Sequence, residues 1–201
     1  MRIIIIDGSD NGDPCMEYVK TLASEHTTVG IAGYNIGHGR GLDAGLKMVK
    51  TRYALLFDSD IVMLKSPLLQ MLNMFDEDTY GVGYLEKSGL DGYDYGAHAH
   101  HKHQEHMFML HPYFALISVE RYFQFAPLVH HGAPFFKAAL DIHKQGLTSK
   151  IIKEFPGLGH SSGVGWTWKG EPREYIEHHP GNTRRLRRER GLPEIEAGWE
   201  R

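Results

Sequence analysis

The sequence predicts an α/β fold, in which a mostly parallel sheet is flanked by helices within a single domain. Three observations support this prediction. Apolar or β-branched runs occur at residues 2–6, 27–32 and 53–57, helical patterns lie between them, and a polar loop follows the first and third runs. Strands that alternate with helices are typical of a parallel sheet covered by helices.

The elements of the first half follow from spacing and from turn residues. The run at 2–6 ends in a polar, glycine-bearing loop at 7–12, as a parallel strand does when it presents ligand groups at its carboxyl end. Apolar residues recur at helical spacing from Cys15 to His26, and a glycine-rich loop spans 33–41. A helix is predicted at 42–50, and the third strand leads directly into Asp58-Ser59-Asp60.

The second half is less regular. Pro67 suits the first turn of a helix at 66–75. The other expected elements are a strand at 80–85, an exposed loop at 87–104, a strand at 114–119 and a helix at 135–143. From Gly181 onward arginine dominates, which predicts a basic surface helix or arm.

Composition excludes some classes of protein. The 201 residues include 22 Lys and Arg against 25 Asp and Glu, so a net charge of -3 gives no general attraction to nucleic acid or anionic membranes. The single cysteine, Cys15, cannot form an intramolecular disulfide, and no apolar run approaches the ~20 residues that span a bilayer. We therefore expect a soluble, cytoplasmic protein. The 14 histidines make metal chemistry worth testing.

The pair Asp58 and Asp60 is the main candidate for chemistry. Alternate residues of an extended chain face the same way, so these carboxylates can converge while Ser59 points elsewhere. Two carboxylates at the end of a buried strand are costly unless a cation neutralises them, and Mg²⁺ or Mn²⁺ prefers oxygen ligands and bridges to phosphates. The alternative for an isolated Asp-x-Asp is a solvated turn.

Three segments in order resemble the nucleotide-sugar half of family 2 and related GT-A glycosyltransferases. They are residues 5–9 (Ile-Ile-Asp-Gly-Ser), 35–37 (Asn-Ile-Gly) with 40–45 behind it, and 55–60 (Leu-Leu-Phe-Asp-Ser-Asp). The resemblance implies a GT-A, Rossmann-like fold over residues 1–180, with a nucleotide-sugar half at 1–63 and an acceptor half at 64–180. Many family members have an additional strand and helix before the first segment, so it also implies either a fold trimmed at the N-terminus or a nucleotide pocket that is partly built differently.

The resemblance also implies roles for single residues. Asp7 would lie near the nucleobase, Arg40 and Asp43 would line the nucleoside pocket, Asp58 would approach the ribose, and Asp60 would bind the metal. Three further residues of the matching segments are expected to contact the nucleotide sugar: Ser9, Asn35 and Ser59.

A second metal ligand is predicted near the C-terminus. The strand-like Tyr175-Ile176 precedes His178, Gly181 and Arg184, whose spacing resembles the His-x-x-Gly-x-x-Lys element of some retaining GT-A enzymes, with arginine in place of lysine. By this resemblance His178 is a metal ligand, with His179 the next candidate. Arg184 would pair with phosphate oxygens, as arginine does bidentately. The alternative is that both histidines are ordinary turn residues.

The catalytic base stays open. Residues 111–114 and 130–134 resemble acceptor-side segments of bacterial family 2 relatives, yet the second lacks the acidic pair that inverting members usually carry there. His131, Glu120 and Asp141 are the candidates, with Asp141 expected to be exposed on a helix. Stereochemical outcome is not assigned.

Three other groups have a structural and a functional interpretation. The histidines between His98 and His106 are expected to be solvated, with acceptor contact as the alternative. Trp166 and Trp168 suit either sugar stacking or core packing. The arginines between Arg184 and Arg190 are either a solvated basic face or a lid within residues 181–201 that closes over the diphosphate.

The sequence thus predicts an Mn²⁺- or Mg²⁺-dependent glycosyltransferase. The donor would be a nucleotide-diphosphate sugar, UDP-linked rather than GDP-linked, and the acceptor an unknown hydroxyl on a saccharide, a lipid-linked molecule or another compound. A homo-oligomer is compatible with this prediction. One alternative is a nucleotidyltransferase, although the first loop lacks the glycine-rich, basic phosphate loop usual there. Another is a noncatalytic module that binds nucleotide sugar or metal.

Overall fold

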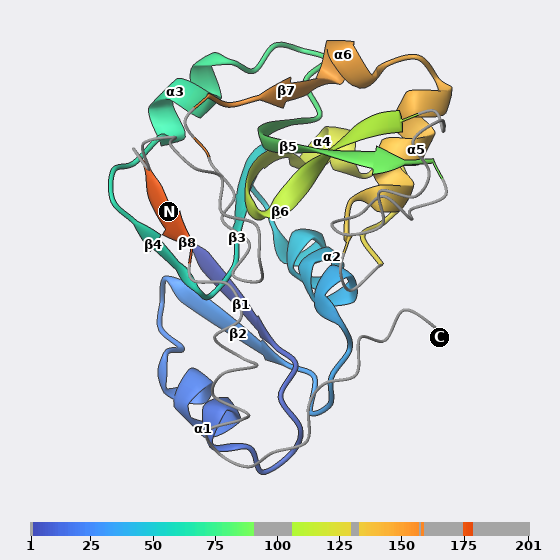
Figure 1. Cartoon of the computed structure of the whole chain (residues 1–201). Helices are drawn as coiled ribbons and strands as arrows, with labels where there is room; N and C mark the ends of the chain where they lie inside the picture. The colour runs from blue at the N-terminus through green and yellow to red at the C-terminus, as the bar shows by residue number, and fades with distance from the viewer. Residues whose placement is uncertain (1, 91–105, 130–132, 157, 159–174, 179–201) are drawn as a thin grey trace.

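The computed structural model describes residues 2–90, 106–129, 133–156, 158 and 175–178 (Figure 1). Its elements confirm the α/β class. In chain order they are β1 (Ile3–Asp7), α1 (Pro14–Thr21), β2 (Thr27–Ile31), α2 (His38–Met48), β3 (Tyr53–Phe57), β4 (Ile61–Met63), α3 (Leu68–Asn73), β5 (Gly81–Gly89), β6 (His106–Ser118), α4 (Val119–Tyr122), α5 (Phe136–Lys144), α6 (Thr148–Ile151), β7 (Ile152–Glu154) and β8 (Ile176–His178).

The strand pairing corrects one part of the prediction, because the largest described sheet is mostly antiparallel. That sheet has the order β3-β6-β5-β7, in which both β3 and β5 run antiparallel to β6 and only β5 and β7 are parallel. The expected parallel pairing holds for β1 and β2, while β4 and β8 pair antiparallel. The regular alternation of strand and helix ends after β3, and the long apolar β6 then pairs with a strand on each side.

The first β-α-β unit forms as its local signals predict. The Asp13 side chain accepts a hydrogen bond from the backbone N–H of Cys15 at 2.7 Å, and Pro14 occupies the first turn of α1. Helix α2 begins at His38, inside the stretch predicted as a loop. It follows Gly37, whose φ of 82° favours glycine, and Asn35 Oδ1 accepts from the Gly37 N–H at 2.9 Å.

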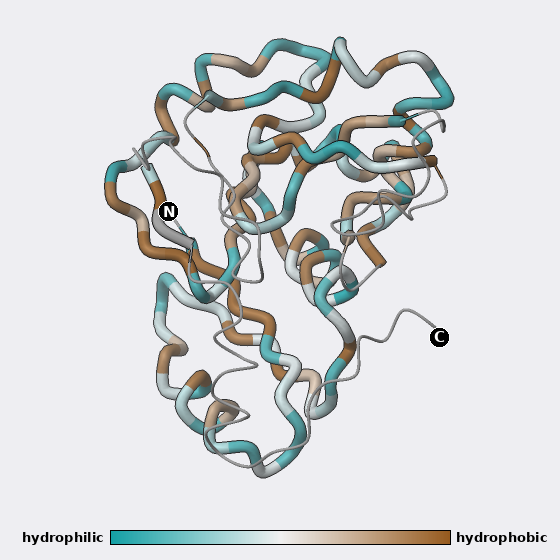
Figure 2. The backbone as a smooth tube through the Cα atoms, in the orientation of Figure 1, coloured by the Kyte–Doolittle hydropathy of each residue, from teal (hydrophilic) through white to brown (hydrophobic). Residues whose placement is uncertain are grey.

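Two hydrophobic clusters cover the two faces of the four-stranded sheet. Because side chains alternate along a strand, Leu56 and Ile117 belong to one cluster while Leu55 and Leu116 belong to the other. The first cluster packs under α5 and the α2 residue Leu46, and the second contains residues from α3, β4 and β8. Figure 2 shows the hydrophobic stretches along β1 and β4.

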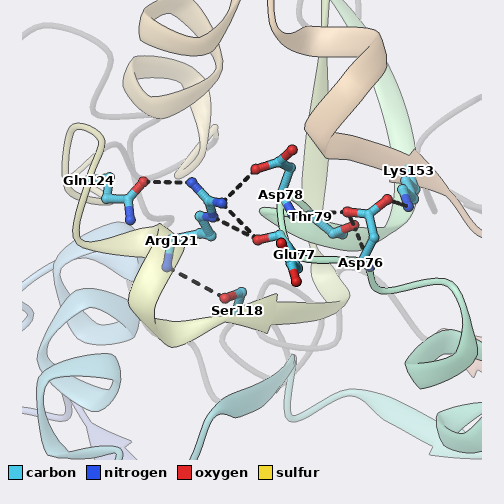
Figure 3. A network of polar contacts seen from close by, with 8 residues as sticks. All are labelled: Asp76, Glu77, Asp78, Thr79, Ser118, Arg121, Gln124 and Lys153. Carbon is cyan, nitrogen blue, oxygen red and sulfur yellow. Dashed lines mark hydrogen bonds and ion pairs between the residues drawn. The ribbon is translucent and has the colours of Figure 1, made fainter.

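A polar network holds the turn that leads into β5 (Figure 3). Arg121 on α4 donates to the carbonyl oxygen of Glu77 from both Nε (3.1 Å) and Nη2 (2.7 Å), and Nη2 also reaches Asp78 Oδ1 at 2.6 Å. Lys153 on β7 binds Asp76 Oδ2 at 2.6 Å. Hydrogen bonds from Lys153 and then Thr79 hold the pKa of Asp76 well below its ordinary value. The network therefore ties the turn to α4 and β7.

Strand and helix bounds in the second half differ from the prediction in several places. Strand β5 continues to Gly89, so residues 87–89 are strand rather than loop, with Ser88 and Gly89 buried. Strand β6 begins at His106, eight residues before the predicted 114, because its pairing with β5 extends the sheet. Helix α3 begins after Pro67 and is shorter than predicted, and α5 matches the prediction to within one residue at each end.

Candidate active site

The acidic residues lie in the tight turn between β3 and β4. Asp58 follows the last residue of β3, and Asp60 immediately precedes β4. Both aspartates are half-buried, whereas Ser59 between them is exposed. The turn therefore holds two carboxylates partly out of solvent at the carboxyl end of an apolar strand, which is the setting predicted from the sequence.

Contacts from two other elements fix Asp58. Its backbone N–H donates to the carbonyl oxygen of Tyr113 on β6 at 3.0 Å. Its Oδ1 atom lies 3.0 Å from Nε2 of His38, the first residue of α2. The sequence did not predict a role for His38, although its position next to Gly37 in the Asn35-Ile36-Gly37 segment was a usable signal. A histidine that contacts a carboxylate in this way orients the carboxylate and can tune its affinity for a cation.

The pairing of β4 with β8 brings the C-terminal segment to the acidic turn. The backbone of His178 is the register partner of Ile61, the residue that follows Asp60. The carbonyl oxygen of Tyr175 also accepts from the N–H groups of Leu64 (2.7 Å) and Lys65 (3.1 Å). The backbone of His178, one predicted metal ligand, thus lies beside Asp60, another predicted ligand, although the two residues are far apart in the sequence. The His178 side chain lies outside the described part of the structure.

The loop after β1 contributes another buried carboxylate. Asp7 is 8% exposed, and its Oδ1 accepts from the backbone N–H (3.2 Å) and the hydroxyl (2.7 Å) of Ser9. Oδ2 of Asp7 is also buried, and no donor among the described residues binds it. The backbone of the loop at Tyr34, Asn35 and Ile36 lies within 4 Å of the position a Cβ would take at Gly8. The structure therefore brings together the segments that contain Asp7, Ser9 and Asn35. Oδ2 of Asp7 is a buried hydrogen-bond acceptor in this region.

The predicted residues on α2 have different surroundings. Arg40 is exposed. Asp43 is engaged within the protein, because Oδ1 accepts from the Tyr122 hydroxyl at 2.6 Å and Oδ2 pairs with Lys47 at 2.6 Å. Burial, followed by the Asp43 hydrogen bond, raises the pKa of the Tyr122 phenol. Asp43 thus ties α2 to α4, and its contact with a nucleoside stays a prediction.

None of the proposed bases that the structure describes contacts the acidic turn. Asp141 on α5 is half-buried rather than exposed, and its Oδ2 accepts from the backbone N–H of Ala126 at 3.1 Å, which holds the segment after α4. Glu120 on α4 is exposed. The predictions for His131, His179, Arg184, Trp166, Trp168, most of the histidine cluster and the arginine-rich segment 181–201 lie outside the described residues.

A cavity of about 530 Å³ lies elsewhere and has no predicted site residue in its lining. Arg121 and Asp78, which belong to the polar network, form part of its wall together with Gln124, Phe125 and Lys150. In the described part of the chain, no three His, Cys, Asp or Glu side chains are arranged to hold a metal ion, and no helix is long and apolar enough to cross a membrane.

Comparison with known proteins identifies the family of this chain. The model of the family described as glycosyl transferase family 2 matches residues 1–142. Among solved structures, the crystal structure of HddC from Yersinia pseudotuberculosis is similar, with a TM-score of 0.41 and 13% identity over 77% of this chain and 68% of that chain. That likeness is too distant to support a functional conclusion. No curated protein matches. The family match spans the acidic turn, α2 and the β1 loop, and the chain belongs to glycosyl transferase family 2, with a fold of the GT-A class.

Proposed function

We propose that this chain transfers a sugar from a nucleotide-diphosphate donor, with UDP favoured as the nucleotide, to a hydroxyl group of an acceptor, and that Mn²⁺ or Mg²⁺ assists the transfer. The observation that carries the proposal is the pairing of β4 with β8. It sets the backbone of His178 across from Ile61, next to Asp60 in the acidic turn.

The residues of this turn fit a hard divalent cation. Asp58 and Asp60 supply carboxylate oxygens, which Mg²⁺ and Mn²⁺ prefer, and a histidine at position 178 would add the nitrogen donor that Mn²⁺ accepts. His38 holds Oδ1 of Asp58 at 3.0 Å and so supports one of the ligands. When bound, the cation would stabilise the negative charge that accumulates on the departing diphosphate.

The nucleoside would lie at the loops after β1 and β2. Ligands bind at the carboxyl ends of parallel strands, and β1 and β2 are the parallel pair. The buried Oδ2 of Asp7 can accept a hydrogen bond from a nucleobase N–H, and Ser9, Asn35 and Arg40 are proposed to contact the nucleotide sugar. Ser59 and Arg184 are proposed to contact the diphosphate. Residues 1–63 then form the donor half, residues 64–180 the acceptor half and residues 181–201 a basic lid.

Substitution of Asp60 tests the proposal directly. Asp60→Asn keeps the size of the side chain and removes its charge, so UDP release from UDP-sugars in the presence of Mn²⁺ should fall by about 100-fold or more. Asp78→Asn is the matched control, because Asp78 is an exposed carboxylate that pairs with Arg121. Equal turnover of the two variants would refute the metal assignment.

A further inference from the structure

Strand β6 bulges where it passes the acidic turn. On one side of the irregularity Gly83 pairs with Ala115, and on the other Leu85 pairs with Leu110. Between these pairs β5 has only Tyr84, whereas β6 has residues 111–114. A bulge redirects side chains and is common next to active sites. Gly83 permits the close approach, since a Cβ there would lie 3.0 Å from the carbonyl oxygen of Phe114.

The bulge places His111 in a defined orientation against Glu86. The backbone N–H of Tyr113 donates to Nδ1 of His111 at 3.2 Å, so in the neutral ring the proton is on Nε2. That Nε2 atom lies 3.6 Å from Oε2 of Glu86 on β5. The rings of Tyr84 and Tyr113 contact the imidazole, with centroids 6.3 Å and 4.8 Å away. His111 therefore directs a donor toward the carboxyl group of Glu86.

Glu86 is a half-buried glutamate, and in the described part of the structure one of its carboxyl oxygens has no hydrogen-bond donor. Its side chain is 23% exposed, and among the described residues no donor binds the buried Oε2. Burial raises the pKa of Glu86 to about 7. A carboxyl group held in this way destabilises the fold whenever it is charged, and such groups occur at sites where proton transfer is needed.

Glu86 lies on the face of the sheet that packs against β4 and β8. By strand alternation Glu86 shares a sheet face with Val82 and Tyr84, which belong to the cluster that also contains Ile61 of β4 and Ile176 of β8. The residues of β6 paired with β3 end at Phe114, whereas Glu86 pairs with Met109, on the stretch of β6 that continues past the end of β3. Tyr113, in the bulge, accepts from the N–H of Asp58.

We propose that Glu86 is the general base that takes the proton of the acceptor hydroxyl, and that His111 is a positioning residue that orients the Glu86 carboxylate. The inference rests on the proposed function and supplies the base that the sequence left open. The acceptor oxygen forms a bond to the anomeric carbon, and the bond from that carbon to the diphosphate oxygen breaks with its electron pair on the diphosphate. The hydroxyl proton moves to Oε2 of Glu86. This single displacement inverts the anomeric configuration.

Burial sets the pH behaviour of Glu86, and other titratable groups lie around it. Among the described residues these are Tyr84 on the same strand and His111 and Tyr113 on β6, and burial raises the pKa of the Tyr113 phenol far above its ordinary value. The Tyr113 phenol therefore stays neutral through the neutral pH range. The base must be ionised to accept a proton, so turnover should rise with pH through about 7.

Glu86→Gln, with Glu77→Gln as its control, tests the proposal. Glu77 is also a glutamate but is exposed, and Arg121 contacts its backbone carbonyl oxygen. Two quantities are measured for each variant: stabilisation by UDP with Mn²⁺, and kcat for UDP release from UDP-glucose, UDP-galactose and UDP-N-acetylglucosamine with monosaccharide acceptors. Both variants should bind UDP with Mn²⁺ as the wild type does. Only Glu86→Gln should lower kcat, by about 100-fold or more.

Two further variants make the result independent of folding. Glu86→Asp keeps an ionisable group, so its reduced kcat should still rise with pH, while the residual kcat of Glu86→Gln should not. His111→Gln should shift the midpoint of the pH profile and lower kcat less than Glu86→Gln does. Wild-type kcat and pH profile in Glu86→Gln would overturn this inference alone. A wild-type chain that neither binds UDP with Mn²⁺ nor releases it would overturn the proposed function, and this inference with it.

Discussion

The backbone N–H of Asp58 donates a hydrogen bond to the carbonyl oxygen of Tyr113 at 3.0 Å, and this bond joins the acidic turn to the bulge of β6. Phe57, which immediately precedes Asp58, also pairs with Phe114 of the bulge. The bulge therefore contacts the acidic turn, and it also carries His111, whose Nε2 lies 3.6 Å from Oε2 of the proposed base Glu86.

Replacement of His38 by alanine should weaken dependence on the cation. His38 Nε2 lies 3.0 Å from Asp58 Oδ1, and loss of a group that orients a ligand typically costs about 10–100-fold in metal affinity. The measurement is the Mn²⁺ concentration for half-maximal UDP release. His26→Ala is the control, because His26 is exposed and its side chain lies beside the neighbouring Glu25. A His38→Ala variant with the same Mn²⁺ requirement as His26→Ala would show that His38 does not support the site.

Tyr122→Phe should destabilise the fold. The Tyr122 hydroxyl donates to Asp43 Oδ1 at 2.6 Å and accepts from the Leu128 N–H at 3.1 Å, and the side chain is buried. Its removal leaves both partners unsatisfied, so the free energy of unfolding should fall by about 1–3 kcal/mol. Urea denaturation measures the change, and Tyr18→Phe on the exposed face of α1 should have almost no effect. A difference below about 0.5 kcal/mol would mean that this link between α2 and α4 adds little.

Glu86 should make stability depend on pH in a defined direction. Its pKa is raised from 4.5 to about 7 in the fold, so the folded chain binds the proton more tightly than the unfolded chain. The stability of the wild type relative to Glu86→Gln is therefore highest below about pH 4.5 and falls by up to about 3 kcal/mol as the pH rises through 7.

Urea denaturation of both proteins between about pH 5 and 8.5 measures this difference, and the contributions of other titrating groups cancel in the comparison. A difference that is constant with pH would mean that Glu86 is ionised as easily in the folded chain as in the unfolded chain.

Local patterns were sufficient for the first half of the fold. The strand at residues 53–57 has the predicted bounds, because a short apolar run enters a polar turn on one side and follows a loop on the other. The start of α2 was missed, because glycines at 39 and 41 have low helix propensity. They are helical here since α2 packs closely on β1, where a Cβ at Gly41 would lie 3.7 Å from Ile6.

Long-range pairing explains what the sequence did not reveal. The full lengths of β5 and β6 depend on their contact with each other, which no local spacing records. The same holds for the site: Asp58 and Asp60 lie close together in the sequence and were predicted, while His38, which contacts Asp58, and the proposed base Glu86 come from other elements. The mostly antiparallel pairing of the strands in the largest described sheet could not be predicted from the sequence either, because apolar runs do not show strand direction.

Nucleotide binding tests the central claim most directly. The melting temperature of the wild type is measured with UDP, GDP and CDP, each with and without Mn²⁺, and compared with that of Asp60→Asn. A ligand that binds only the folded state raises the melting temperature, so UDP with Mn²⁺ should raise that of the wild type by about 5 °C or more at saturating concentration. UDP without Mn²⁺, and UDP with Mn²⁺ on Asp60→Asn, should each give a much smaller rise. Equal stabilisation of both proteins, or none of the wild type, would contradict a cation held between this turn and the donor diphosphate.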